Sequence, residues 1–235
     1  RSSSKFWQMI GRGTRLCKDL FGPGKDKENF IIFDFCENFE FFGKKPKGLD
    51  GKRGRSLTER LFEQRLKLIF LLQKNGSDAS LLYADELRSF MLGQVSKLEE
   101  NSFLVRQHWR VVEKYRDPFR WNALAELEVK EVLDHIAPLV FEPGDDEQAK
   151  RFDGLCYNMQ LDLLQKGSIS DQYMNETIST AAALSKKGAI PMVSAKMDQI
   201  KLVQTADFWQ EVNLPKIETL RKDLRDLIRF IESSS

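Results

Sequence analysis

Residues 56–76 read SLTERLFEQRLKLIFLLQKNG, and this stretch decides the fold class of most of the chain. Leu57, Leu61, Leu68 and Leu72 recur on one face at helical spacing. The opening Ser-Leu-Thr-Glu fits a capping box, and the closing Asn-Gly is a typical helix stop. The stretch therefore predicts an amphipathic helix with one buried face.

Helical patterns of the same kind continue to the end of the chain. The spacing of apolar residues predicts further helices over about 80–100, 103–115, 124–136, from about 145, over 170–187 and from about 215. We therefore expect a mainly α fold in which residues 57–235 form one helical bundle domain. The bulky rings are expected to anchor its core rather than to stack on bases, namely Trp109, Trp121 and Trp209.

Residues 1–42 have a different character. An amphipathic segment opens them, and Gly11 and Gly13 are expected to end its helix because glycine disfavours a helix interior. The apolar run FIIFDF at 30–35 is typical of a buried strand. This region is therefore expected to be a small α/β fragment that precedes the helical domain.

Residues 43–56 are a linker by composition, since glycine, proline and cations dominate them. The cations are Lys44, Lys45, Lys47, Lys52, Arg53 and Arg55. Such a cluster would attract DNA phosphates in a salt-dependent and sequence-independent way. It is equally typical of a solvated connector, and the sequence leaves both interpretations open.

Composition narrows the class of protein without naming it. The chain has 37 basic and 35 acidic residues, a balance that does not by itself indicate a nucleic-acid partner. Its three cysteines lie far apart among apolar residues, which predicts reduced thiols rather than a disulfide framework. No run of 18 apolar residues occurs, so no membrane span and no membrane partner are expected.

The stretch QMIGRGTR at 8–15 carries the chemistry. Arg12 and Arg15 are three residues apart beside glycines, so both guanidinium groups can reach one anion. An arginine directed at a transferring phosphoryl group stabilises the charge of the transition state. The alternative is a glycine-rich turn with two solvated arginines.

The longer stretch FWQMIGRGTRLC at 6–17 resembles motif VI of superfamily 2 helicases, in the form found in the motor (R) subunit of type I restriction enzymes. The following DLFG loop and the strand run at 31–35 resemble the same family. The tail is similar to the end of EcoEI-like R subunits, through the segments 190–193, 208–209 and 220–228.

The resemblance implies that residues 1–42 end a second RecA-like lobe. It makes Arg15 an arginine finger, Arg12 a second γ-phosphate contact and Gln8 a coupling residue, with Gly11 also at the ATP site. ATP and Mg²⁺ would serve the intact subunit, a type I site-specific deoxyribonuclease with ATPase and translocase activity. No G-x-x-x-x-G-K-[ST] motif occurs, so the chain alone is expected to be inactive and to hold no cofactor.

The family also implies partners and a location. These are double-stranded DNA, the methyltransferase (modification) and specificity subunits, and the cytoplasm of a prokaryote. The helical domain would dock the motor on the methyltransferase core. Two alternatives remain open, namely the C-terminal region of another superfamily 2 DNA helicase and a purely structural assembly module.

Two other possible sites are weaker. Glu128 and Lys130 superficially fit the end of a nuclease motif, but they lie in a helical pattern and are expected to form a solvated helix face. His108 and His135 are the only histidines, and the cysteines offer no C-x-x-C spacing. The sequence therefore predicts no metal site.

Overall fold

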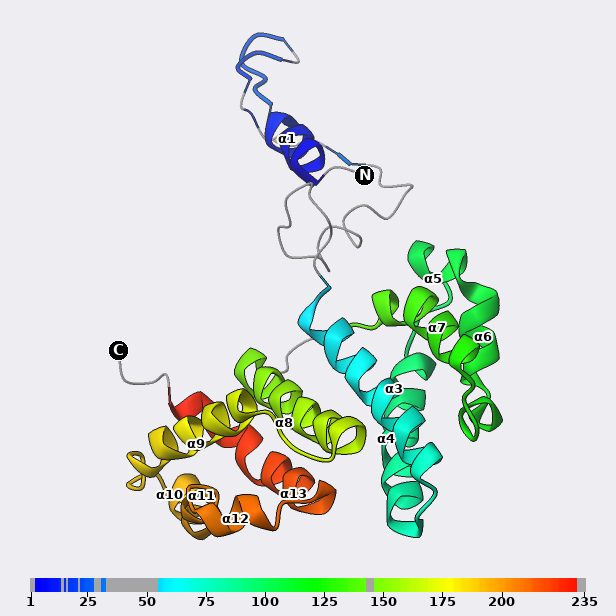
Figure 1. Ribbon diagram of the computed structural model, residues 1–235. Helices are drawn as coiled ribbons and strands as arrows, with labels where there is room; N and C mark the ends of the chain where they lie inside the picture. The colour runs from blue at the N-terminus through cyan, green and yellow to red at the C-terminus, as the bar shows by residue number, and fades with distance from the viewer. Residues whose placement is uncertain are drawn as a thin grey trace. The chain divides into compact units, whose positions relative to one another are not determined.

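The computed structural model describes residues 3–13, 15, 17–20, 22–27, 31–32, 55–142 and 146–231. It divides into two compact units (Figure 1). The first comprises Arg1–Arg55 and Glu99–Gln107, and the second comprises Ser56–Leu98 and His108–Ser235. Across the described ranges the chain is mainly helical, which confirms the expected α class.

The second unit opens with α3 (Leu57–Asn75), the helix that the sequence indicates most clearly. The Ser56 hydroxyl accepts a hydrogen bond of 3.1 Å from the Glu59 backbone and caps its first turn. At the other end Gly76 takes a left-handed conformation with φ 70°, and its N–H reaches the Leu72 carbonyl. Both predicted boundaries of this helix are confirmed.

The core of the second unit forms where α3 packs against α4 (Asp78–Ser96) and α8 (Glu147–Lys166). The inward face of α3 is fully buried at Leu61, Phe62, Leu66, Leu68, Ile69 and Leu72. Burying a side chain of this size contributes about 1.5 to 3 kcal/mol relative to leaving it exposed. Packing rather than helix propensity therefore holds α3 in place.

A second apolar cluster lies toward the C-terminus. Its elements are α8, α9 (Asp171–Ser185), the short helices α10 (Pro191–Ser194), α11 (Met197–Leu202) and α12 (Ala206–Gln210), α13 (Leu214–Leu224) and the 3-10 helix η3 (Arg225–Phe230). Its buried residues include Met159, Leu184, Ile200 and Leu220. Figure 1 shows these helices gathered around α8 and α13.

In the sequence, the short helices of 103–139 follow α4 and precede α8. They are α5 (Phe103–Gln107), α6 (Trp109–Arg116), η1 (Pro118–Trp121), α7 (Glu126–His135) and η2 (Ala137–Leu139). The single helix predicted over 103–115 is wrong, because His108 leaves helical geometry with φ −116° and ψ 15°. The final helix likewise tightens into η3 after Leu224 instead of continuing as an α-helix.

The first unit contains α1 (Ser3–Gly13). The expectation that glycine ends this helix is confirmed at Gly13 and wrong at Gly11, since α1 runs through Gly11 and ends at Gly13. A glycine costs a helix only about 1 kcal/mol, which its neighbours can offset.

Of the buried strand predicted at 30–35, the structure describes only Ile31 and Ile32. Neither is in a strand, and their exposed fractions are 77% and 40%. The rest of that run lies outside the described residues. In the ranges that are described, no strand occurs and no helix is long and apolar enough to cross a bilayer.

Candidate functional site

Of the side chains that the sequence singles out, Gln8 and Arg12 lie on α1 and Arg15 lies just beyond its end. Gln8 and Arg12 are four residues apart and therefore share a helix face. Arg15 follows one turn later, and its N–H points to the Arg12 carbonyl at 3.4 Å. All three side chains are exposed, and neither guanidinium group has a hydrogen bond or ion pair among the described residues.

Gly11 lies between these side chains on the exposed surface of α1. A Cβ added there would meet nothing within 4 Å. The first unit therefore does not itself require a glycine at this position.

Lys27 completes the C-terminal end of α1. Its ammonium donates hydrogen bonds to the carbonyls of Gly13 and Arg15, the latter at 3.2 Å. The last carbonyls of a helix carry a partial negative charge that would repel an anion. Lys27 donates to two carbonyls at this end and so offsets part of their negative charge. An anion bound by the neighbouring arginines would therefore be repelled less.

The loop of residues 17–27 brings Lys27 back to the helix. The Lys27 N–H donates to the Cys17 carbonyl at 2.9 Å and closes the loop. Asp19 has a positive φ of 56°, and its carboxylate accepts from the Gly24 N–H at 2.5 Å. Its own N–H donates to the Asp26 carboxylate at 2.9 Å, so internal bonds define the loop.

The proposed DNA-contacting cations of the linker cannot be placed. Arg55 is described and exposed. The others lie outside the described residues, namely Lys44, Lys45, Lys47, Lys52 and Arg53.

Glu128 and Lys130 are not arranged as a nuclease site. The Glu128 carboxylate accepts from the Ala125 N–H at 3.0 Å and caps α7. Lys130 lies exposed on the same helix, as a solvated face requires.

Two of the three tryptophans singled out are anchors. The indoles of Trp121 and Trp209 donate to the carbonyls of Tyr115 and Val203, each at 2.8 Å. Trp121 is 1% exposed and Trp209 is half-buried. Trp109 is also half-buried, with the Arg116 guanidinium 4.9 Å from its ring centroid.

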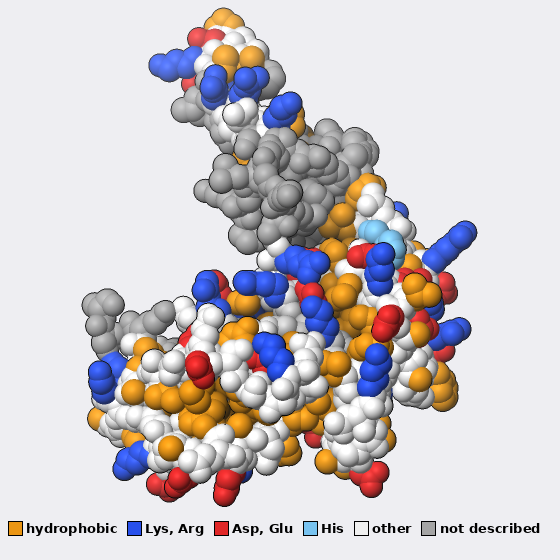
Figure 2. Space-filling view, viewed as in Figure 1, with side chains coloured by type: hydrophobic (Ala, Val, Ile, Leu, Met, Phe, Trp, Pro, Cys, Tyr) orange, Lys and Arg blue, Asp and Glu red, His pale blue; other side chains and the backbone are white. Residues whose placement is uncertain are grey.

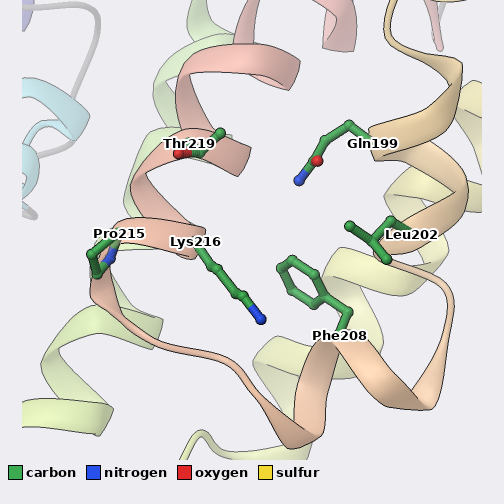
Figure 3. Close-up of a pocket in the computed structure, with 6 residues that line it drawn as sticks. All are labelled: Gln199, Leu202, Phe208, Pro215, Lys216 and Thr219. Carbon is green, nitrogen blue, oxygen red and sulfur yellow. The ribbon is translucent and has the colours of Figure 1, made fainter.

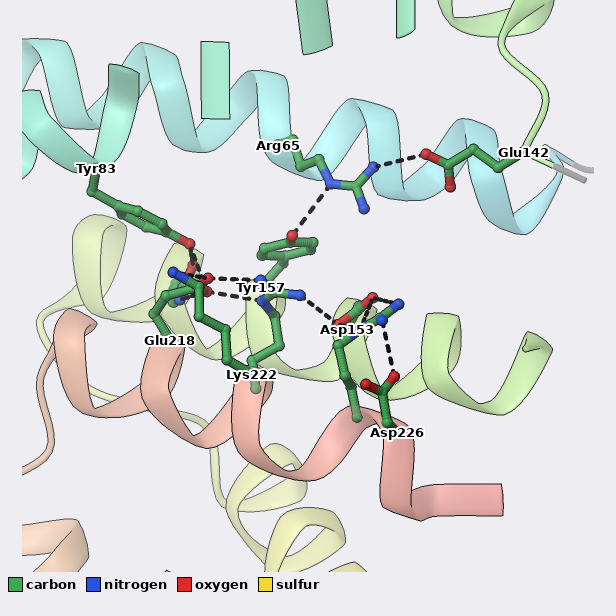
Figure 4. A network of polar contacts seen from close by, with 11 residues as sticks. Arg65, Tyr83, Glu142, Asp153, Tyr157, Glu218, Lys222 and Asp226 are labelled. Carbon is green, nitrogen blue, oxygen red and sulfur yellow. Dashed lines mark hydrogen bonds and ion pairs between the residues drawn. The ribbon is translucent and has the colours of Figure 1, made fainter. Parts of the chain in front are cut away.

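A buried polar network, shown in Figure 4, crosses the second unit between α4, α8 and α13. The Tyr83 hydroxyl contacts Gln160 at 2.8 Å and Glu218 at 3.0 Å. Burial raises the pKa of Tyr83 well above its ordinary value, and the Glu218 charge adds to the increase. The phenol is therefore a donor at every physiological pH.

The same network contains a carboxylate held by two cations. Asp153 is 1% exposed, and it accepts from Arg221 at 2.8 Å and from Arg225 at 3.2 Å. Arg221 also pairs with Glu218 at 2.7 Å. Burial opposes the ionised form of Glu218, but the bond from Arg221 leaves its pKa below the usual value. These charges are paired, as buried charges must be, and they fix α13 on α8.

A shallow hollow of about 200 Å³ lies at the start of α13 (Figure 3). Leu202, Phe208 and Pro215 supply its apolar lining, and Gln199, Lys216 and Thr219 supply polar groups. Its lysine is already paired, since the Lys216 ammonium lies 2.9 Å from Glu211. No cluster of chemically reactive groups faces this hollow in the part of the chain that is described.

No family model, no curated protein and no solved structure matches this chain.

The structure also shows groups that sequence reasoning missed. Lys27 gave no signal, because its role depends on a loop closing over carbonyls that are distant in sequence. His108 and His135 were noted only as isolated residues, yet the fold brings their rings together. Only tertiary contacts could have revealed either arrangement.

Proposed function

We propose that this chain belongs to an ATP-driven DNA motor and contributes the end of its second RecA-like lobe together with a helical domain. The exposed pair Arg12 and Arg15, at the end of α1 and just beyond it, carries the proposal. Guanidinium groups that have no partner among the described residues suit the oxygens of a triphosphate. Lys27 supports them by engaging the carbonyls at the helix end.

The particular motor that we propose is the R subunit of a type I restriction endonuclease, of the EcoEI-like kind. This step rests on the resemblance of residues 6–17 and of the tail to that family. The intact subunit would translocate duplex DNA with ATP and Mg²⁺ and cleave it away from its recognition site. Arg15 would stabilise the transferring γ-phosphoryl group, Arg12 would bind it, and Gln8 would couple the two lobes.

We further propose that the helical domain docks the motor on the methyltransferase core. Phe119 and Leu127, both in the second unit, are 80% and 82% exposed. Side chains of this size would gain free energy if a protein partner covered them. A module that serves assembly alone, or the tail of another superfamily 2 helicase, would present the same helices.

The decisive experiment replaces Arg15 in the intact subunit. Arg15→Ala should lower the ATPase kcat by about 10³- to 10⁵-fold, because an arginine finger acts on the transition state. Assembly with the modification and specificity subunits should be unchanged. Arg60→Ala is the matched control, since Arg60 is an exposed arginine on α3, outside the motif. Full ATPase activity in Arg15→Ala would disprove the motor assignment.

The alternatives are separated by the rest of the protein and by its genes. An amino-terminal nuclease domain, with neighbouring modification and specificity genes, would favour restriction. A motor without them would favour another helicase.

A further inference from the structure

The two histidines of the chain meet between α6 and α7, although they are 27 residues apart in sequence. His108 precedes α6, and His135 is the last residue of α7. Their Nδ1 atoms are 3.1 Å apart, and their ring planes are inclined at 43° with centroids 5.1 Å apart. The same nitrogen of each ring therefore faces its neighbour.

We propose that Nδ1 of His108 and Nδ1 of His135 together bind one divalent transition-metal ion of the zinc class, with water completing its coordination. Zinc binds an imidazole nitrogen at about 2.0 to 2.1 Å, so two such nitrogens on one tetrahedral ion lie about 3.3 to 3.4 Å apart. The observed separation of the two Nδ1 atoms, 3.1 Å, is slightly shorter than this. The rings need little movement to share an ion.

Contacts elsewhere on the two helices hold the rings in place. The Glu131 carboxylate on α7 accepts from the Lys114 ammonium at 2.7 Å and from the Tyr115 hydroxyl at 2.8 Å, both on α6. Tyr115 is fully buried, which fixes this joint. Because α6 and α7 are tied together without a metal, binding an ion does not have to order them.

The proton balance of binding is simple. Without a metal the two Nδ1 atoms share one hydrogen in an N–H···N bond, whose direction depends on the tautomer. When the ion takes both Nδ1 lone pairs, that hydrogen moves through solvent to Nε2 of the same ring. Metal binding to the neutral form of the pair releases no net proton, whereas acid competes with the metal.

The surroundings of His108 favour its neutral form, which is the form that binds a metal. Burial and then the neighbouring His135 ring lower the pKa of His108, which keeps that ring neutral near pH 7. Glu131 lies one turn before His135 on the same helix face, and its charge is already paired with the Lys114 ammonium. Figure 2 shows histidine side chains in pale blue at the molecular surface, where an ion can reach them.

The donor set limits the choice of metal. Imidazole nitrogens favour zinc, nickel and copper over magnesium and calcium, which prefer oxygen. Among the residues described, no third histidine, cysteine or carboxylate joins the pair to form a larger cluster. Water must therefore supply the remaining ligands, and the site is weaker than a structural zinc site with four protein ligands. The proposal is independent of the ATPase assignment.

The test uses the full chain without a histidine tag, Zn²⁺ as the probe and Mg²⁺ as the contrast. Titration calorimetry should give one saturable Zn²⁺ site and no heat with Mg²⁺. Nitrogen-15 NMR of the imidazoles should show Nδ1 of both rings changing on Zn²⁺ addition, and the spectrum is simple because the chain has only two histidines. His108→Asn should weaken Zn²⁺ binding by more than about tenfold.

Two controls make the result decisive. Lys130→Gln, an exposed change on α7, should leave Zn²⁺ affinity unchanged. Cys17→Ser with Cys36→Ser should also leave it unchanged, whereas a loss there would assign the metal to thiols and overturn the proposal. Equal Zn²⁺ affinity in His108→Asn, or imidazole resonances that do not respond, would overturn it as well. Circular dichroism of each variant confirms that it has folded.

Discussion

We expect Asp153 to contribute more to the free energy of unfolding of the second unit than a charged side chain at the surface does. It lies in the interior with Arg221 and Arg225 directed at its two oxygens. Desolvating three charges is unfavourable, and their mutual attraction offsets that loss only while all of them are present.

We expect Asp153→Asn to lower the free energy of unfolding by about 3 kcal/mol, because it removes the buried counter-charge that two partly buried guanidinium groups share. Urea denaturation measures this. Asp226→Asn is the control, since the Asp226 side chain is 65% exposed and pairs only at the surface with Arg225. That change should cost less than about 1 kcal/mol. Equal losses in the two variants would contradict this account of the network.

Glu131 predicts how stability depends on pH. Hydrogen bonds from Lys114 and Tyr115 hold its pKa below the ordinary value of 4.5, against the opposing effect of burial. Because the folded-state pKa is the lower one, the stabilisation is present above the ordinary value and is lost as pH falls through the folded pKa.

We therefore expect Glu131→Gln to flatten the fall in stability as the pH falls below 4.5. Denaturation curves at several pH values measure the slope in the variant and the parent. Glu147→Gln is the control, because Glu147 is an exposed carboxylate that pairs with Arg151 along the surface of α8. A slope unchanged by Glu131→Gln would show that this carboxylate is not linked to folding.

At the scale of elements, two glycines have opposite effects on helix stability, because one ends a helix and the other lies inside one. Gly76 is left-handed at the end of α3, whereas Gly93 lies inside α4 with open space around its Cα. We expect Gly76→Ala to destabilise the protein by about 1 kcal/mol. Gly93→Ala should stabilise it by about 0.5 to 1 kcal/mol. Thermal unfolding of the two variants measures the sign of each change in stability. Changes of the same sign would contradict the roles assigned to these two glycines.

The long helices could be predicted because apolar period and caps agree along their whole length. α3 shows this best, with a serine cap, a continuous apolar face and a glycine stop. The break at His108 could not be predicted, since no proline or glycine marks it. The short helices α10 to α12 could not be predicted either. A stretch of four to six residues is too brief to show a period.

At the scale of the whole molecule, the two units differ in how they should respond to truncation. The second unit holds both large apolar clusters, and Glu99–Gln107 groups with residues 1–55 instead. We expect a chain that begins at Ser56 to fold, with the increase in amide exchange confined to 99–107. Hydrogen-exchange mass spectrometry tests this against the full chain. Loss of protection throughout α3 and α8 would contradict it.

Sequence and structure contribute differently to the candidate sites. The positions of Gln8 and Arg12 on one exposed face of α1 follow from helical spacing, so the sequence could predict that these two lie together. The contact between His108 and His135 depends on α7 folding back on α6, and the cations around Asp153 come from the far end of the chain. No local pattern encodes such distances.

The two bonds from Lys27 have a mechanical consequence. They tie the end of α1 and the backbone of Arg15 to a loop that has its own internal bonds. A displacement of this loop would therefore also move the turn that carries the arginines, because hydrogen bonds couple the two segments. A conformational change that reaches this loop from elsewhere could in this way change the positions of both guanidinium groups together.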